Sequence, residues 1–141
     1  MNDFKIALGL DYGRRKIGAA VGEQKIGSAR PLPIIQMKNG QPSWEDLDKI
    51  MEKWSPEAIV LGVSTHLDGT THNLTEEIEI LGRNLKKRYD TPVFFIDEHL
   101  SSQAAVERKK NGIKSPLDSV AAGLILETWF EEQKKLADIV Q

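Results

Sequence analysis

Three acidic residues, each next to an apolar segment, are the best candidates for chemistry in this chain. Asp11 follows an apolar run at 4–10, Glu98 follows another at 93–96, and Asp118 opens a third that continues to residue 130. Cleavage of phosphodiester bonds by divalent cations needs a few carboxylates converging from different elements, because hard ions such as Mg²⁺ prefer oxygen ligands. These three acids can supply such a set.

Each of the three acids also fits a purely structural role. Asp11 precedes Gly13, and aspartate is common before glycine in turns. Glu98 can be a solvated residue at the end of a strand. Asp118 lies three residues after Ser115, which can cap a helix with Pro116 at its first position. The spacing of the acids alone leaves both interpretations open.

A basic turn follows the first acid directly. Arg14, Arg15 and Lys16 lie just after Asp11, and residues 1–30 carry six Lys or Arg against three Asp or Glu. Such a cluster can meet the phosphates of a nucleic acid, although a solvated turn is the simpler interpretation. The net charge of −2 argues against a strongly basic nucleic-acid-binding domain.

The elements that would position Asp11 begin with a meander of three strands. Apolar residues alternate over 4–10 with Lys5, Ala7 and Gly9, which predicts a strand whose second face is small enough for another element to pack closely. Further strands are expected at 17–21 and 27–35. Pro31 and Pro33 cannot donate ladder hydrogen bonds, so the third strand should lie at a sheet edge.

Helices and strands alternate after the meander. A helix is expected at 44–54, capped by Ser43, then a buried strand at 58–63 and a helix at 74–89. The order is completed by a strand at 93–96, a helix from Ser101 or Ser102 to 111–112 and a last helix starting near Ser115. This order predicts an α/β fold with a partly parallel sheet, in which ligands gather at the carboxyl ends of the strands.

Composition excludes several classes of protein. The 141 residues are 40% hydrophobic and 28% charged, which predicts one globular domain spanning 1–141. The absence of cysteine excludes disulfides and thiolate metal sites. No apolar run reaches the roughly 18 residues of a membrane span, so we expect a soluble cytoplasmic protein without a membrane partner.

Other residues that could take part in binding or catalysis have simpler interpretations. The three histidines lack the spacing of metal ligands, and the three tryptophans fall at apolar helical positions that favour core packing over base stacking. The loop at 68–70 can be a plain turn or a phosphate-binding loop.

Five segments in order give the chain a resemblance to a known family. They are LGLDYGRRKIGAAVG at 8–22, SARPLP at 28–33, IVLGVSTHLDGT at 59–70, DEHLSS at 97–102 and LDSVAAGLILETWF at 117–130. Together they resemble the YqgF (RuvX) family of pre-16S rRNA nucleases over nearly the whole chain.

The resemblance implies a ribonuclease H-like fold with a mixed five-stranded sheet, its first three strands antiparallel, and helices on both faces. It assigns Asp11, Glu98 and Asp118 as catalytic ligands of Mg²⁺ or Mn²⁺. The implied substrate is the 5′ end of precursor 16S rRNA. The same family has also been proposed to resolve Holliday junctions, which makes branched DNA the alternative substrate.

The chain departs from the family pattern near its substrate-binding positions. Ser64, His66 and His99 replace the usual Pro, Asn and Arg. Lys114 is the nearest substitute for a basic residue that commonly precedes the last acid. No metal ligand is lost, but a neutral histidine at position 99 cannot form the guanidinium's fork to a phosphate. The expected substrate-binding residues are therefore Arg14, Arg15, Lys16 and Lys114.

Two other classes of protein share part of this pattern. Actin-like ATPases and sugar kinases also hold phosphates with an Asp-x-Gly hairpin, but they need a second such hairpin, which this chain lacks. A non-catalytic RNA-binding module would not need three converging acids, whose mutual repulsion costs stability when no metal is bound. The sequence does not predict the oligomeric state.

Overall fold

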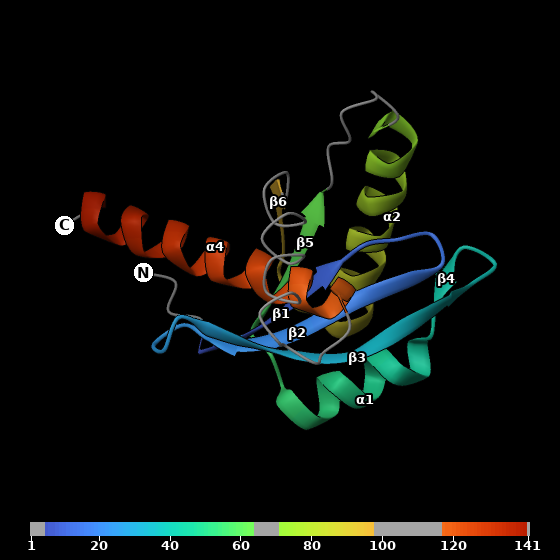
Figure 1. The fold of residues 1–141 in the computed structure, drawn as a ribbon, viewed down its shortest axis with the longest axis horizontal. Helices are drawn as coiled ribbons and strands as arrows, with labels where there is room; N and C mark the ends of the chain where they lie inside the picture. Colours follow the sequence, from blue (N-terminus) through green and yellow to red (C-terminus); the bar gives the residue numbers. More distant parts are fainter. Residues whose placement is uncertain (1–4, 64–70, 98–116, 141) are drawn as a thin grey trace.

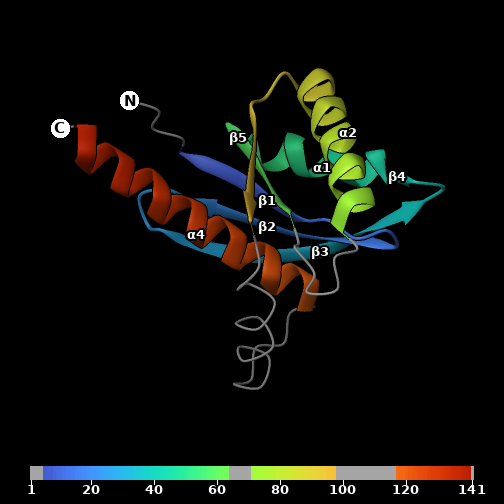
Figure 2. The same ribbon diagram turned by 90° about the horizontal axis from the view of Figure 1, so that it is seen from above.

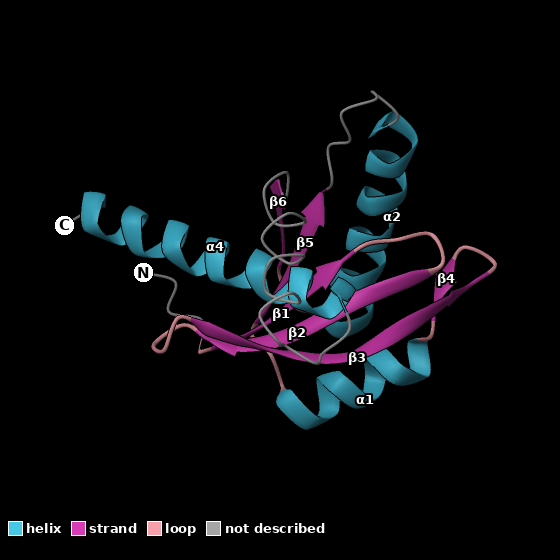
Figure 3. Ribbon diagram, in the orientation of Figure 1, coloured by secondary structure: helices cyan, strands magenta, loops and turns pink. Residues whose placement is uncertain are grey.

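The computed structural model describes residues 5–63, 71–97 and 117–140. Six strands and three helices occupy these ranges (Figures 1 and 3). The strands are β1 (Ile6–Asp11), β2 (Lys16–Glu23), β3 (Ser28–Lys38), β4 (Gln41–Pro42), β5 (Ala58–Val63) and β6 (Val93–Asp97). The helices are α1 (Trp44–Trp54), α2 (Thr71–Tyr89) and α4 (Leu117–Val140). The helix expected at 101–111 lies outside the described residues.

One mixed sheet joins all six strands in the order β4-β3-β2-β1-β5-β6. The strands β1 to β4 pair antiparallel, whereas β5 runs parallel to β1 and β6 runs parallel to β5. The predicted α/β class and the antiparallel meander are confirmed. The sheet has one strand more than the five expected. The additional strand is β4, a two-residue strand that follows the left-handed turn at Asn39 and Gly40, where φ is 54° and 76°.

The edge position predicted for the third strand is also correct. Among the described residues, β3 has β2 on one side, and β4 reaches only Met37 and Lys38 on the other. Pro31 and Pro33 lie in the part of β3 that has no outer neighbour in the described sheet. The missing proline N–H groups therefore break no ladder on that side.

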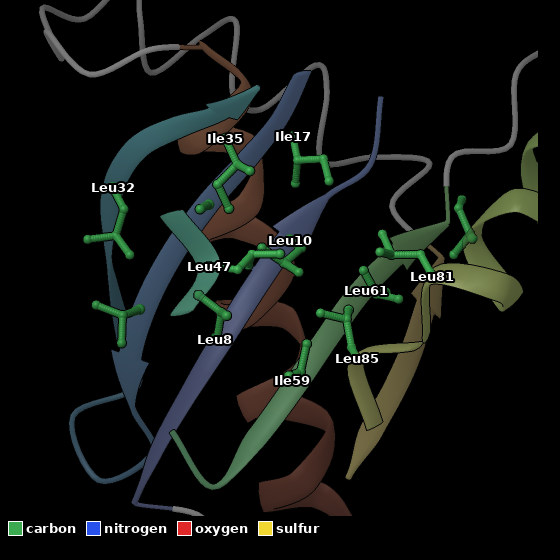
Figure 4. Close-up of a cluster of buried hydrophobic side chains, with 13 residues drawn as sticks. Leu8, Leu10, Ile17, Leu32, Ile35, Leu47, Ile59, Leu61, Leu81 and Leu85 are labelled. Atoms are coloured by element: carbon green, nitrogen blue, oxygen red, sulfur yellow. The ribbon is translucent and has the colours of Figure 1, made fainter. Parts of the chain in front are cut away.

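Helices cover both faces of the sheet, as expected (Figure 2). On one face, α1 and α2 bury a cluster with the strands, shown in Figure 4: Leu8, Leu10, Ile17, Ile35, Leu47, Ile59, Leu61, Ile78, Leu81 and Leu85. On the other face, α4 packs on Ala7, Ala20, Ala58, Val60 and Ile96 through its own Ala122, Ile125, Leu126, Trp129 and Phe130. Alternate residues of each strand thus serve two different cores.

The small face of β1 lets α4 approach the sheet closely. A Cβ atom placed on Gly9 would lie 2.6 Å from Cγ of Leu126 and 2.8 Å from the carbonyl oxygen of Ala122. No side chain fits in that space, so the helix backbone rests almost directly on the strand. The small side chains of this face, predicted from the alternation at 4–10, are the reason.

Among the described residues, no helix is both long and apolar enough to cross a membrane.

The amphipathic helix α1 begins and ends where its sequence indicates. The hydroxyl of Ser43 accepts a hydrogen bond from the backbone N–H of Asp46, and Ser55 ends the helix in the left-handed conformation. Of the tryptophans, Trp129 is buried in the core, whereas Trp44 and Trp54 are half-buried at its margin.

A polar contact ties α1 to α2 outside the core. Arg88 donates two hydrogen bonds to Asp48, from Nε at 3.0 Å and from Nη2 at 2.8 Å, and the Tyr89 hydroxyl donates a third at 2.6 Å. These hydrogen bonds favour the charged carboxylate and hold the pKa of Asp48 at about 2, below its ordinary value of 3.8. The contact therefore depends on pH.

We predict that Asp48→Asn lowers Tm by about 3 °C at pH 7, since an exposed ion pair contributes little. Because the folded-state pKa is the lower one, the stabilisation is complete above about pH 4 and is lost as the pH falls toward 2. Thermal unfolding of both proteins between pH 7 and pH 2 should give a difference in Tm that shrinks over that range. A difference that stays constant would contradict the assignment.

Candidate active site

Asp11 ends β1, the inner strand at which the antiparallel and parallel parts of the sheet meet. It is half-buried and pairs with Gly18 of β2 on one side and Gly62 of β5 on the other. Since alternate residues of a strand share a face, Asp11 lies on the same face as Ala7 and Gly9, the face covered by α4. Neither backbone neighbour carries a side chain, so space is left beside the carboxylate.

The strand leading to Glu98 ends at the same edge of the sheet. The last residue of β6, Asp97, pairs with Val63 at the end of β5, and Ile96 pairs with Gly62. Ile96 packs in the α4 cluster, on the face where Asp11 lies. Only β5 separates β1 from β6, and adjacent strands lie about 4.8 Å apart. Glu98 itself lies outside the described residues, and so does the expected substrate-binding residue Lys114.

A buried hydroxyl fixes the start of α4 beside Asp11. Asp118 is the second residue of this helix, and the structure describes its backbone only. The next residue, Ser119, is fully buried and accepts a hydrogen bond of 3.3 Å from the backbone N–H of Ala19. Ala19 pairs with Leu10, the residue before Asp11. The start of α4, which carries Asp118, is therefore anchored to β2 next to the end of β1.

The Ser119 contact lies at an irregularity of the sheet, since the register between β2 and β3 shifts between Ile17 and Ala19. Removing the Ser119 hydroxyl would leave the buried N–H of Ala19 without this partner. We predict that Ser119→Ala lowers the free energy of unfolding by about 1–3 kcal/mol in urea denaturation. Thr128→Ala, which removes an exposed hydroxyl of the same helix, should change it by no more than about 0.5 kcal/mol. Equal effects of the two variants would argue against this anchor.

The basic turn between β1 and β2 is exposed but not isolated. Gly13 makes it tight, because a Cβ atom there would lie 2.5 Å from the carbonyl oxygen of Lys16. Arg14 forms an ion pair with Glu77 of α2, with 3.2 Å between Nε and Oε2. Arg15 and Lys16 are exposed beside it, so the turn presents cations at the edge where Asp11 lies.

Glu77 also reaches the residue that follows Asp11. The Tyr12 hydroxyl donates a hydrogen bond of 3.4 Å to the same Oε2 atom. Burial, and then the negative charge of Glu77, raise the pKa of the Tyr12 hydroxyl above its usual value. Glu77 thus fixes the turn from the α2 side. In the sequence, Glu77 is one of several charged residues of the helix expected at 74–89, and no local signal links it to residues more than 60 positions away.

Ser119 was missed as well, although a serine inside the apolar run at 117–130 could have marked a buried polar contact. Within the described residues, no group of three or more potential metal ligands occurs. Of the three predicted acids, only the side chain of Asp11 is described. The strand β6, which precedes Glu98, and the start of α4, which carries Asp118, lie at the same edge of the sheet. Carboxylates placed there would match the oxygen ligands that Mg²⁺ and Mn²⁺ prefer.

Comparison with known proteins decides the family. The family model RuvX, described as "Holliday junction resolvase", matches residues 5–132. The chain belongs to the RuvX family. A relative from Pseudomonas paraeruginosa, named "Putative pre-16S rRNA nuclease", is 38% identical over 134 residues, covering 91% of this chain and 93% of the relative. A relative of the same name from Hydrogenovibrio crunogenus is 38% identical over 126 residues, covering 89% and 93%. The family and the nuclease assignment predicted from the five motifs are confirmed.

Solved structures of resolvases share the fold of this RuvX chain. RuvC of T. thermophilus, in complex with a Holliday junction substrate, aligns with a TM-score of 0.57 at 17% identity, covering 92% of this chain and 96% of that one. The yeast mitochondrial Holliday junction resolvase Ydc2 aligns with a TM-score of 0.51 at 13% identity, covering 94% and 80%. The fold is thus ribonuclease H-like, as predicted. At these identities the likeness extends to the fold alone.

Proposed function

We propose that this RuvX chain is a single-domain cytoplasmic nuclease that hydrolyses phosphodiester bonds with Mg²⁺ or Mn²⁺ held by Asp11, Glu98 and Asp118. The observation that supports it best is the convergence at one sheet edge. Asp11 ends β1 on the face covered by α4, Asp118 opens α4, and Glu98 follows β6, whose Ile96 packs on that helix. Three chain segments remote in sequence thus run toward one place, an arrangement that supports a shared site for the three acids.

Each residue has a defined part in the proposed site. Asp11 supplies the most firmly positioned oxygen ligands, because β1 is held between β2 and β5. Ser119 fixes the helix that carries Asp118. A divalent cation bound there would activate a water and neutralise the charge that develops on the leaving oxygen. Arg14, Arg15 and Lys16 hold the phosphate backbone near the acids, joined by Lys114.

The proposed substrate is precursor 16S rRNA, cut near its 5′ end during ribosome biogenesis. The names of the relatives, which are 38% identical over most of the chain, favour it. Branched DNA is the second candidate, because the description of the family model names a Holliday junction resolvase. The structural likeness to RuvC does not decide between them, since it concerns the fold alone.

One assay separates these possibilities. The protein is incubated with precursor 16S rRNA and with a synthetic four-way DNA junction, each with Mg²⁺, with Mn²⁺ and with EDTA. We expect metal-dependent shortening of the 5′ end of the RNA and an intact junction. Symmetrical nicking of the junction alone would favour the resolvase. Binding without cleavage of either substrate in any metal would leave a non-catalytic RNA-binding module and overturn the nuclease proposal.

A further inference from the structure

A groove opens on the face of the sheet opposite α4, beside the turn that follows Asp11. It has a volume of about 310 Å³ and lies between α2, the turn between β3 and β4, and the end of β1. Its lining includes Tyr12, Met37, Asn39, Gln41, Ile80 and Asn84. Glu77 lines it as well, with its carboxylate paired with Arg14. A second hollow continues it along α2, because Gln41 and Asn84 line both.

The lining combines an apolar floor with polar groups that can form hydrogen bonds. Met37 and Ile80 contribute apolar surface, and the side chain of Ile80 is 45% exposed although it is large and hydrophobic. Asn39, Gln41 and Asn84 bring three carboxamides, each with both donors and acceptors. Carboxamides can pair with the edges of nucleobases, whose faces are apolar.

Cations and an aromatic ring line the second hollow. Lys87 and Arg88 lie along it with Trp44, and the guanidinium of Arg88 is 5.0 Å from the centre of the Trp44 ring. Aromatic rings and guanidinium planes are the surfaces on which unpaired bases stack in RNA-binding proteins. The positive charge of Lys87 can meet a phosphate of the same strand.

The β1–β2 turn connects this groove with the proposed active site. Asp11 points to the face covered by α4, and Tyr12, the next residue, packs toward the opposite face, where it lines the groove. A nucleic acid strand leaving the acids would therefore cross the edge of the sheet at the turn. Arg14, Arg15 and Lys16 lie at that crossing, where they can neutralise the phosphates.

We propose that this groove binds unpaired nucleotides of the RNA strand next to the bond that is cut. The inference rests on the proposed nuclease function and specifies the form of its substrate, a strand that is single-stranded beside the cleavage site. Paired bases cannot enter, because their hydrogen-bonding edges are occupied and their faces are stacked. The groove would therefore favour RNA with an unpaired end over a fully paired duplex.

Neighbouring lysines of α2 provide a matched test. Lys87 lines the second hollow that continues the groove, whereas Lys86 lies on the same exposed turn of the helix and lines neither hollow. Binding of a fluorescent eight-nucleotide single-stranded RNA is measured by anisotropy in EDTA, so that no cleavage is required. Lys87→Gln should weaken binding about fivefold and reduce the slope of log K against log salt by about 0.7. Lys86→Gln should leave both unchanged.

A second variant tests the hydrogen-bonding part of the groove without changing the charge. Asn84 is exposed, so Asn84→Ala should fold normally. We expect it to weaken binding about fivefold with an unchanged salt slope, and to leave binding of a blunt RNA duplex unaffected. In NMR titrations with CMP and UMP, the side-chain amide signals of Asn39, Gln41 and Asn84 should shift together.

The outcomes separate this proposal from the nuclease proposal. Equal loss of binding in Lys86→Gln and Lys87→Gln would overturn the groove, because it would indicate general charge attraction. Normal binding and normal rRNA cleavage by Lys87→Gln and Asn84→Ala would overturn it as well, with the nuclease intact. If Lys87→Gln and Asn84→Ala weaken RNA binding but the wild type cuts neither substrate, the nuclease proposal is overturned and the nucleotide-binding groove is retained.

Discussion

Asp11→Asn is expected to lower the rate of phosphodiester cleavage at least about 1000-fold while the protein stays folded. The amide keeps the shape of the carboxylate but carries no charge and binds Mg²⁺ or Mn²⁺ weakly. A loss of about 4 kcal/mol of transition-state stabilisation corresponds to that factor. Because Asp11 lies at the end of β1 and not in the core, its replacement should not disturb the packing.

The control is a second Asp→Asn substitution far from the proposed site. Asp90 is exposed and has φ 51°, a left-handed conformation that asparagine adopts readily. Asp90→Asn should cleave as the wild type does. In thermal unfolding, Mn²⁺ should raise Tm of the wild type and of Asp90→Asn but not of Asp11→Asn. Full activity of Asp11→Asn would remove it from the catalytic set.

In the absence of metal the same experiment has a second informative outcome. If three carboxylates converge, their mutual repulsion destabilises the fold until a cation binds. Asp11→Asn should then unfold at the same or a slightly higher temperature than the wild type in EDTA. A distinctly lower Tm would indicate that Asp11 makes a structural contact of its own, the turn role that the sequence left open.

Local patterns predicted most of the secondary structure because the signals are local. The cap at Ser43, the end of α1 at Ser55 and the strand at 58–63 follow from neighbouring residues, and the structure has them in place. The two-residue strand β4 was missed, although Asn39-Gly40 is the strongest short hairpin signal. Both strands of this hairpin contain proline, and β4 is too short to show an alternation of apolar and polar residues.

Contacts between remote segments could not be predicted in the same way. The ion pair of Arg14 with Glu77 spans 63 positions, and the hydrogen bond from Ala19 to Ser119 spans 100. The sequence around each of these residues contains no signal that identifies its contact partner. Asp11 was found because its hairpin motif is local, whereas the residues that hold the surrounding elements in place became visible only when the sheet and its helices were assembled.

Two glycine substitutions on either side of the α4 interface should have opposite effects on stability. In Gly9→Ala, the new Cβ would lie within 3 Å of the Leu126 branch point and of a backbone oxygen of α4, neither of which can swing aside. The helix must shift away from β1, and we expect the free energy of unfolding to fall by about 2–3 kcal/mol. Gly123 lies inside α4, where a Cβ would meet only Ala29 and Ala20, at 3.7 and 3.9 Å. Gly123→Ala should therefore raise the free energy of unfolding by about 0.5–1 kcal/mol through helix propensity.

Urea denaturation of both variants measures these changes. Activity adds a second readout, because the displaced helix carries Asp118. Gly9→Ala should lose cleavage activity even at a temperature where it remains fully folded, whereas Gly123→Ala should keep it. If Gly9→Ala were as stable as the wild type, α4 could not rest on β1 as closely as the structure indicates. If it were destabilised but fully active, the placement of Asp118 would not depend on that contact, and the helix start would be held by the Ser119 anchor alone.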